Sequence, residues 1–187
     1  MVGGKAALVL TLFVLAASQT PEARSNDFPT AQSITVALCD KASVRPEDWK
    51  KAKETVEQIL SSRNLAIDWF DQSCTLPRGD RYFSVFVLSK APAGLKSNDA
   101  ALGASLVPNG AISRAYIFFD RVVEFDRSKG NGWIYPGIIL GHAIAHELGH
   151  LLGEPHSRAG IMRAVWTRED WNDAVHQGMK FINRPER

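Results

Sequence analysis

The alternation of apolar and polar residues predicts a sheet with one helix inserted near its start. Runs rich in β-branched and aromatic residues have the length and pattern of strands. These runs cover residues 33–38, 65–70, 82–88, 102–107 and 115–123. Between the first two runs, apolar residues recur at helical spacing after Pro46, which suits the first turn of a helix. The helical set is Trp49, Ala52, Val56, Ile59 and Leu60.

The last third of the chain has a different pattern, which predicts two more helices. Residues 137–152 form a long apolar stretch that ends at Gly153, a suitable C-terminal cap. Thr167 and Asp170 resemble an imperfect capping box at the start of a final helix. That helix is expected to carry Trp171, Ala174, Val175 and Phe181. The order β-α-β-β-β-β-α-α predicts an α+β fold with a mixed sheet, helices over one face and a helical C-terminal section.

Composition narrows the class of protein. The 187 residues are 45% hydrophobic and 22% charged, which is typical of one globular domain. The formal net charge is +2, and the basic residues are scattered, so neither nucleic acid nor a membrane surface is an expected partner.

The N-terminus has the three-part pattern of a secretory signal peptide. Lys5 is followed by an apolar run over residues 6–17, and small residues then offer a cleavage site. We expect cleavage after residue 18, or as late as residue 23, and a single domain over 19–187. The run is too short for a convincing transmembrane helix, and a frayed N-terminal helix is the alternative. Export to an extracellular or periplasmic compartment follows, without stable membrane insertion.

Two cysteines, Cys39 and Cys74, lie at the ends of the first two predicted strands. In an exported protein a lone pair usually forms a disulfide, and two buried free thiols are the alternative. The bridge would join strands that flank a helix, which is the geometry of a βαβ unit with adjacent parallel strands.

Four of the five histidines fall between His142 and His156. His146 and His150 are one helical turn apart and project from the same face, which suits two ligands of one tetrahedral ion. Glu147 is placed to reach water at the metal rather than the metal itself. Gly153 allows a sharp exit from the helix, which would bring His156 to the same ion.

The apolar character of residues 137–152 predicts that this helix is buried. Two imidazoles and a carboxylate are costly to bury without partners, and a metal ion removes that cost. Core histidines satisfied by ordinary hydrogen bonds are the alternative. Structural zinc sites usually have four ligands, whereas three histidines leave a position open for water. One catalytic Zn²⁺ is therefore expected, with Glu147 as the base that activates zinc-bound water for attack on a carbonyl.

The string from His146 to His156, followed by Gly160-Ile161-Met162, resembles the metzincin clan of zinc endopeptidases. Within the clan, a serine directly after the third histidine, here Ser157, is most similar to the pattern of the matrixin-like members. The resemblance implies a zincin fold with a five-stranded twisted sheet, and an N-terminal, an active-site and a C-terminal helix. It also implies that Met162 forms a methionine turn beneath the zinc. In the clan, an antiparallel edge strand above the cleft binds an extended peptide by strand addition. The matching residues are Leu102, Gly103, Ala104, Ser105 and Leu106.

The sequence departs from the clan in three ways. The spacing from His156 to Met162 is short, no tyrosine closely follows Met162, and no cysteine-switch motif is present. His142 is expected to line the cleft or form a hydrogen bond rather than bind metal. His176 is expected at the surface or in packing, and Trp166 and Trp171 as core residues.

The leading hypothesis is a secreted zinc endopeptidase that acts on extended peptide or protein segments. A zinc-bearing binding or inhibitory module is one alternative, favoured by the short loop and the missing propeptide motif. A zinc hydrolase of a non-peptide amide is another. The natural substrate and the oligomeric state do not follow from the sequence.

Overall fold

The structure is a computed structural model and describes residues 32–70, 74, 81–93, 100–106, 113–131 and 135–182. The expected signal peptide and both of its candidate cleavage sites lie outside these residues. In the described part of the chain no helix has the length and apolar character needed to cross a membrane.

The sheet contains five strands in the order β2-β1-β3-β5-β4. Their bounds are β1 Gln32–Lys41, β2 Leu65–Phe70, β3 Tyr82–Leu88, β4 Gly103–Leu106 and β5 Ser113–Phe118. The first four strands of that order run parallel to their neighbours, and β4 pairs antiparallel with β5 at the edge. The mixed α+β sheet expected from the sequence is confirmed.

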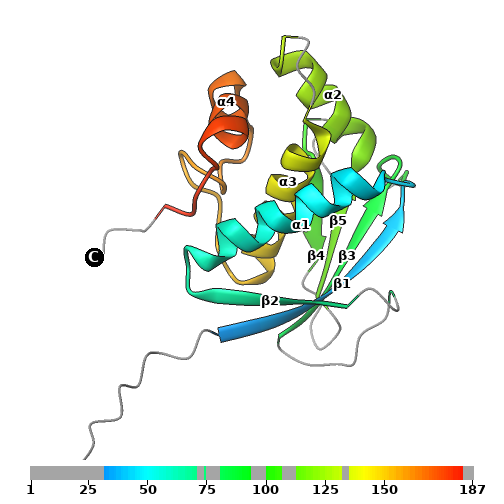
Figure 1. The fold of residues 1–187 in the computed structure, drawn as a ribbon, viewed down its shortest axis with the longest axis vertical. Helices are drawn as coiled ribbons and strands as arrows, with labels where there is room; N and C mark the ends of the chain where they lie inside the picture. Colours follow the sequence, from blue (N-terminus) through cyan, green and yellow to red (C-terminus); the bar gives the residue numbers. More distant parts are fainter. Residues whose placement is uncertain are drawn as a thin grey trace, which may run out of the picture. The chain divides into compact units, whose positions relative to one another are not determined.

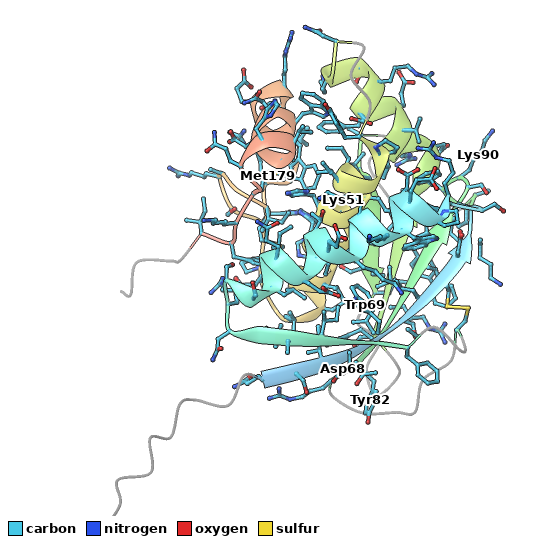
Figure 2. All side chains as sticks on the ribbon, viewed as in Figure 1. Lys51, Asp68, Trp69, Tyr82, Lys90 and Met179 are labelled. Carbon is cyan, nitrogen blue, oxygen red and sulfur yellow. A yellow bond between two sulfur atoms is a disulfide. The ribbon has the colours of Figure 1, made fainter. Side chains whose placement is uncertain are left out.

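One face of the sheet forms the core, and α1 (Pro46–Ser61) and α3 (Pro136–Leu151) lie against it (Figure 1). The register places Val36 beside Phe83, and Val85 beside Ala115, so alternate residues of the central strands share this face. These four side chains are 0–3% exposed. On β2, Trp69 points toward α1 and donates from its indole to Glu57, whereas its neighbour Asp68 points away (Figure 2).

The strand predicted over residues 115–123 is wrong in its second half. Strand β5 ends at Phe118, and helix α2 (Phe119–Lys129) begins at the next residue. The boundary has no turn residue and no side-chain cap, so the apolar run AYIFFDRVV continues across it. Val122 and Asp126, four residues apart, are the buried residues of this helix. The helical spacing was therefore present in the sequence but was hidden by the strand that precedes it.

The sequence predicted both C-terminal helices, α3 and α4, at their observed positions, but it extended the last helix too far. Helix α3 is buried along almost its whole length, as its apolar character predicted. Helix α4 (Arg168–His176) begins with a complete capping box, in which Thr167 and Asp170 each accept from the other's backbone N–H. Phe181 was expected on this helix, but the helix ends at His176, and Phe181 lies beyond it in a segment without regular secondary structure.

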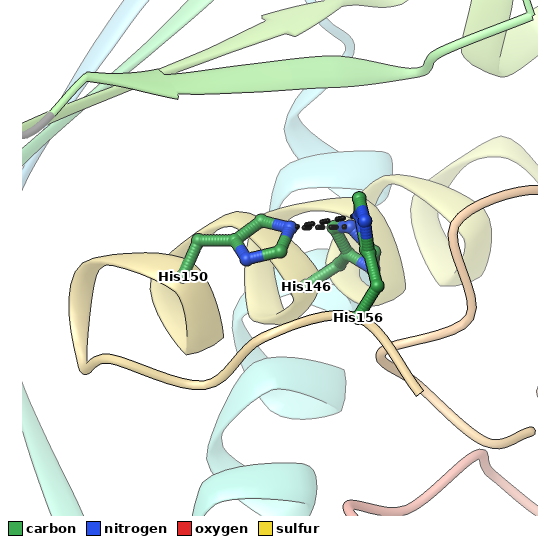
Figure 3. Close-up of side chains that lie close together, drawn as sticks. All are labelled: His146, His150 and His156. Carbon is green, nitrogen blue, oxygen red and sulfur yellow. Dashed lines mark hydrogen bonds between the residues drawn. The ribbon is translucent and has the colours of Figure 1, made fainter. Parts of the chain in front are cut away.

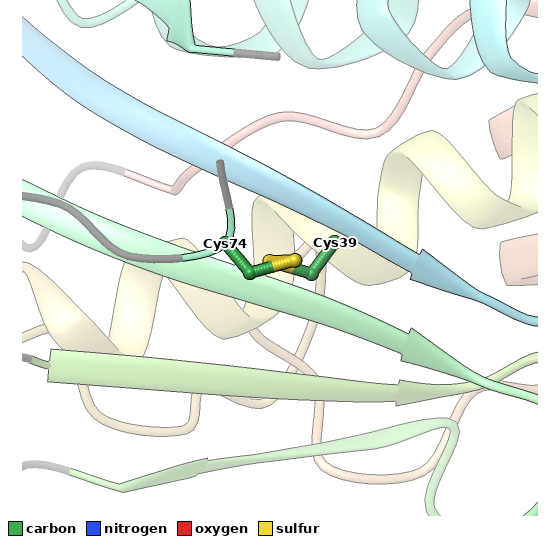
Figure 4. The surroundings of a disulfide bond; sticks show 2 residues. All are labelled: Cys39 and Cys74. Carbon is green, nitrogen blue, oxygen red and sulfur yellow. A yellow bond between two sulfur atoms is a disulfide. The ribbon is translucent and has the colours of Figure 1, made fainter. Parts of the chain in front are cut away.

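Cys39 and Cys74 form a disulfide, and their Cα atoms are 5.1 Å apart (Figure 4). Cys39 is on β1, and Cys74 follows β2, which pairs with β1 in parallel through Gln32–Leu65 to Ala37–Phe70. The bridge therefore links two adjacent strands that flank α1, as expected for a βαβ unit.

Candidate metal centre

Three imidazoles converge on one point at the C-terminal end of α3 (Figure 3). His146 and His150 lie one turn apart on the helix, and His156 follows it. The Nε2 atom of His150 is 3.1 Å from Nε2 of His146 and 3.1 Å from Nε2 of His156. All three histidines offer a ligand atom within 4.8 Å of the others. The structure thus brings together the three residues that the sequence nominated as metal ligands.

The chain reaches this geometry through a turn at Gly153. Its φ of +88° is in the left-handed region, where a side chain would be strained. The N–H of Glu154 donates to the carbonyl of Gly149 over 2.9 Å, so the chain folds back along the last turn of α3. His156 therefore lies beside the two helical histidines, although it is outside the helix.

Backbone carbonyls fix the orientation of two of the rings. His146 Nδ1 is 2.7 Å from the carbonyl of Ile161, and His150 Nδ1 is 2.8 Å from the carbonyl of Glu154. A carbonyl can only accept, so each Nδ1 carries the proton, and each Nε2 presents a lone pair. This is the arrangement that a second-shell acceptor imposes on a metal-ligating histidine.

The Nε2 atoms of the triad lie close together, and a cation bound between them would relieve the repulsion of their lone pairs. Zn–N bonds of about 2.0–2.1 Å in a tetrahedral site separate neighbouring nitrogens by roughly 3.3 Å, close to the observed 3.1 Å. Burial lowers the pKa of His146 to about 4, and burial together with His150 lowers the pKa of His156. Neutral imidazoles are the form that binds metal. The donor set fits a zinc-like cation.

Glu147 lies beside the triad and is 5% exposed. Its Oε2 atom is fully buried and has no hydrogen-bond partner in the described part of the protein. Burial raises the pKa of this carboxyl to about 7, and a hydrogen bond from the Ser105 side chain acts in the opposite direction. A buried acceptor without a partner is costly, so this oxygen would be stabilised by a polar group that reached it from the cavity that Glu147 and the triad share.

The carboxylate of Glu147 lies directly under the edge strand. A Cβ atom on Gly103 would lie 2.9 Å from Oε1 of Glu147 and 2.6 Å from the carbonyl oxygen of Tyr116. Gly103 and Ser105 are two residues apart on β4, so both face this side. The other edge of β4 pairs with none of the described residues. The residues predicted to form an edge strand therefore do so, except that Leu102 immediately precedes β4 and accepts from Phe118 N–H.

Met162, the residue expected to form the methionine turn, is 3% exposed and lies close to Gly149 in the last turn of α3. A Cβ atom on Gly149, the residue before His150, would lie 2.5 Å from the Met162 sulfur, so a larger residue there would require Met162 to shift. The Ser157 N–H donates to the Met162 carbonyl over 2.9 Å. The segment after His156 thus packs under the helix that carries the other two histidines.

A cavity of about 640 Å³ opens beside the triad. Its walls come from β4, from the segment after Met162 and from α2, the helix that sequence analysis missed. Residues of α2 that line it are Arg121, Glu124, Phe125, Ser128 and Lys129. Phe125 makes an edge contact with Trp166, another lining residue, at a ring distance of 6.1 Å. The helical spacing of residues 119–126 was the signal that could have assigned α2 to the site.

His142 is not part of the triad. Its Nδ1 bonds the carbonyl of Ile138 over 2.9 Å, and its Nε2 accepts from the N–H of Met179 over 3.1 Å. The residue is 1% exposed and satisfied by backbone groups, so the hydrogen-bonding role expected for it is correct. His176 is exposed at the end of α4. Trp171 is buried and donates to Asp126, whereas Trp166 is half-buried and lines the cavity.

Comparison with known proteins gives no family. No family model matches the chain, and no curated protein matches it. Among solved structures, the chain is similar to one titled "GM1 bound form of the ECX AB5 holotoxin", with a TM-score of 0.44 and 16% sequence identity. The match covers 80% of this chain and 72% of the other.

Proposed function

We propose that this protein is an exported zinc-dependent endopeptidase. The observation that carries the proposal is the convergence of three imidazole Nε2 atoms beside a buried carboxylate oxygen that has no partner. His146, His150 and His156 would hold the ion, and Glu147 would act as the general base. The Cys39–Cys74 disulfide supports an oxidising compartment.

The zinc ion would supply a Lewis acid for the scissile carbonyl and for the attacking water. Glu147 would transfer a proton from the attacking water to the leaving amine. Its carboxylate accepts a proton from water as the new C–O bond forms, and returns that proton to the amine nitrogen as the C–N bond breaks. Glu147 is 5% exposed, so little of its carboxylate is in contact with bulk water before a substrate binds.

The free edge of β4 supports a peptide rather than another amide as the substrate. An extended peptide can form main-chain hydrogen bonds with Gly103–Leu106, next to the triad. The cavity beside α2 would receive a side chain of that peptide. Leu106, which is 45% exposed, is at the end of this edge.

Replacement of Glu147 by Ala, with Glu147→Gln as a near-isosteric partner, tests this function. Both zinc content and hydrolysis of a diverse peptide library should be measured, with and without a chelator. The proposal expects chelator-sensitive cleavage by the wild type, and variants that keep zinc but lose at least 100-fold in rate. Cleavage by Glu147→Ala at the wild-type rate would reject Glu147 as the base. A wild type that binds zinc and cleaves nothing would favour a binding or inhibitory module.

A further inference from the structure

Arg63 forms a long-range contact with the turn that carries the third histidine. It lies between α1 and β2, and its Nη2 is 2.8 Å from Oε1 of Glu154, 91 residues later in the chain. Its guanidinium carbon also lies 5.1 Å from the centre of the Phe181 ring. The two charged side chains are about one-third exposed, at 33% and 36%. The hydrogen bond lies at the surface, but it is charge-assisted and its guanidinium also packs on Phe181, so it restricts the residue that it holds.

Glu154 is connected to two metal-ligand candidates through its backbone. Its carbonyl accepts from Nδ1 of His150 over 2.8 Å, and His156 follows two residues later. Its N–H is bonded to the carbonyl of Gly149. Movement of Glu154 would therefore rotate the His150 ring and displace His156 at the same time.

Backbone hydrogen bonds from the N–H groups of Leu152, Gly153 and Glu154 close the turn onto the end of α3, whereas side-chain packing adds little to them. Around Gly153 there is open space, since a Cβ atom there would meet nothing within 4 Å. Leu152 is 40% exposed, and Pro155 and His156 are exposed as well. Exposed turns are in general more mobile than the elements that they connect, so a side-chain contact from elsewhere can restrict this turn further. Arg63 provides such a contact from a different part of the fold.

We propose that Arg63 is a positioning residue for the metal site. By holding Glu154, it keeps His150 and His156 converged on the ion that His146 also binds. The inference rests on the proposed function only in taking the triad to bind zinc, and it does not require the protein to cleave peptides. Phe181 contributes as the surface on which the guanidinium packs, and it also contacts the Gly149 region from below.

The test is a double-mutant cycle read out as affinity for zinc alone. Arg63→Ala, Glu154→Ala and the double variant are compared by competition with a chromophoric chelator. Glu154→Ala keeps the carbonyl that His150 uses, so it removes only the contact with Arg63. Loss of a direct second-shell partner costs about 10–100-fold in metal affinity. Arg63 does not contact a metal ligand itself but holds Glu154, which does, so each single variant should weaken zinc binding by a smaller factor of about 3–10. The double variant should weaken zinc binding no more than either single variant does.

Arg45→Ala is the matched control, because Arg45 is also an exposed arginine, paired with Asp48 and Glu47 at the other end of α1. It should bind zinc as the wild type does. Wild-type affinity in Arg63→Ala, full additivity in the double variant, or an equal loss in Arg45→Ala would each overturn the proposal. If Arg63→Ala does not fold, the Glu154→Gln variant tests the proposal instead. It should still weaken zinc binding at least twofold, and an unchanged zinc affinity would overturn the inference. A wild type without zinc affinity would instead reject the proposed function, and this role with it.

Discussion

A Cβ atom on Gly103 would lie 2.9 Å from Cγ of Glu147, so the edge strand and the carboxylate are in contact only because this residue has no side chain. The same Cβ would lie 2.6 Å from the carbonyl oxygen of Tyr116 on the adjacent strand. Neither neighbour can withdraw easily, because one is backbone and the other is 5% exposed. Gly103 thus allows the edge strand proposed to bind a peptide and the proposed general base to occupy adjacent positions.

Gly103→Ala should damage both features. We expect kcat/KM for peptide hydrolysis to fall at least tenfold, and stability to fall by about 1–3 kcal/mol, the usual cost of overpacking a buried site. Zinc content should stay at the wild-type level, since the triad does not contact Gly103. Steady-state kinetics, thermal unfolding and metal analysis check these three outcomes. Wild-type kinetics in a folded variant would show that the close approach has no role in catalysis.

Ser105→Ala removes the hydroxyl that hydrogen-bonds Glu147. A hydrogen bond to a charged group contributes about 1.5–3 kcal/mol. We therefore expect kcat to fall roughly 10–100-fold with a small change in KM, because the substrate edge itself is intact. Ser105→Thr keeps a hydroxyl and should restore part of the rate. Ser113→Ala, on the neighbouring strand β5, serves as the control; an equal loss of kcat there would argue against a specific role for Ser105.

The convergence of the three histidines could be predicted from the sequence, because the spacing of His146 and His150 places both on one helix face and Gly153 allows the chain to turn back. Strands β2 and β3 were predicted at their observed bounds for a similar reason, since each is a short apolar run bounded by polar residues. Helix α2 was missed because no turn residue separates it from β5. The contacts of Glu147 with Gly103 and Ser105 could not be predicted, since they depend on how closely the sheet edge approaches α3.

His142 should make folding sensitive to acid. Burial lowers its pKa from 6.5 in the unfolded chain to about 4 in the folded protein. A depressed folded-state pKa gives stability that is complete above pH 6.5 and is lost as pH falls through 4. Over that window the loss should approach about 3 kcal/mol. Chemical unfolding of chelator-treated protein at pH 7 and pH 4.5 should therefore show a smaller difference for His142→Gln than for the wild type. An equal difference in both proteins would assign the acid sensitivity to other groups.

Zinc should stabilise the fold through the triad. A ligand at about 100 times its Kd raises the free energy of unfolding by roughly 2.7 kcal/mol. Thermal unfolding with zinc and with a chelator should therefore give a higher Tm in zinc for the wild type. His156→Ala should lose most of this increase in Tm, because the two imidazoles that remain would bind zinc much more weakly than three. His176→Ala is the control, since that exposed histidine lies outside the triad. A full zinc shift in His156→Ala would place the ion elsewhere.

Reconstitution of the metal-free protein tests the central claim most directly. The chelator-treated, dialysed wild type is incubated with a diverse peptide library, and cleavage is followed by mass spectrometry as zinc is added up to one equivalent. We expect no cleavage without zinc and cleavage that rises in proportion to zinc until one ion is bound. Cleavage that is independent of zinc, or its absence from a protein that has bound one equivalent, would contradict it.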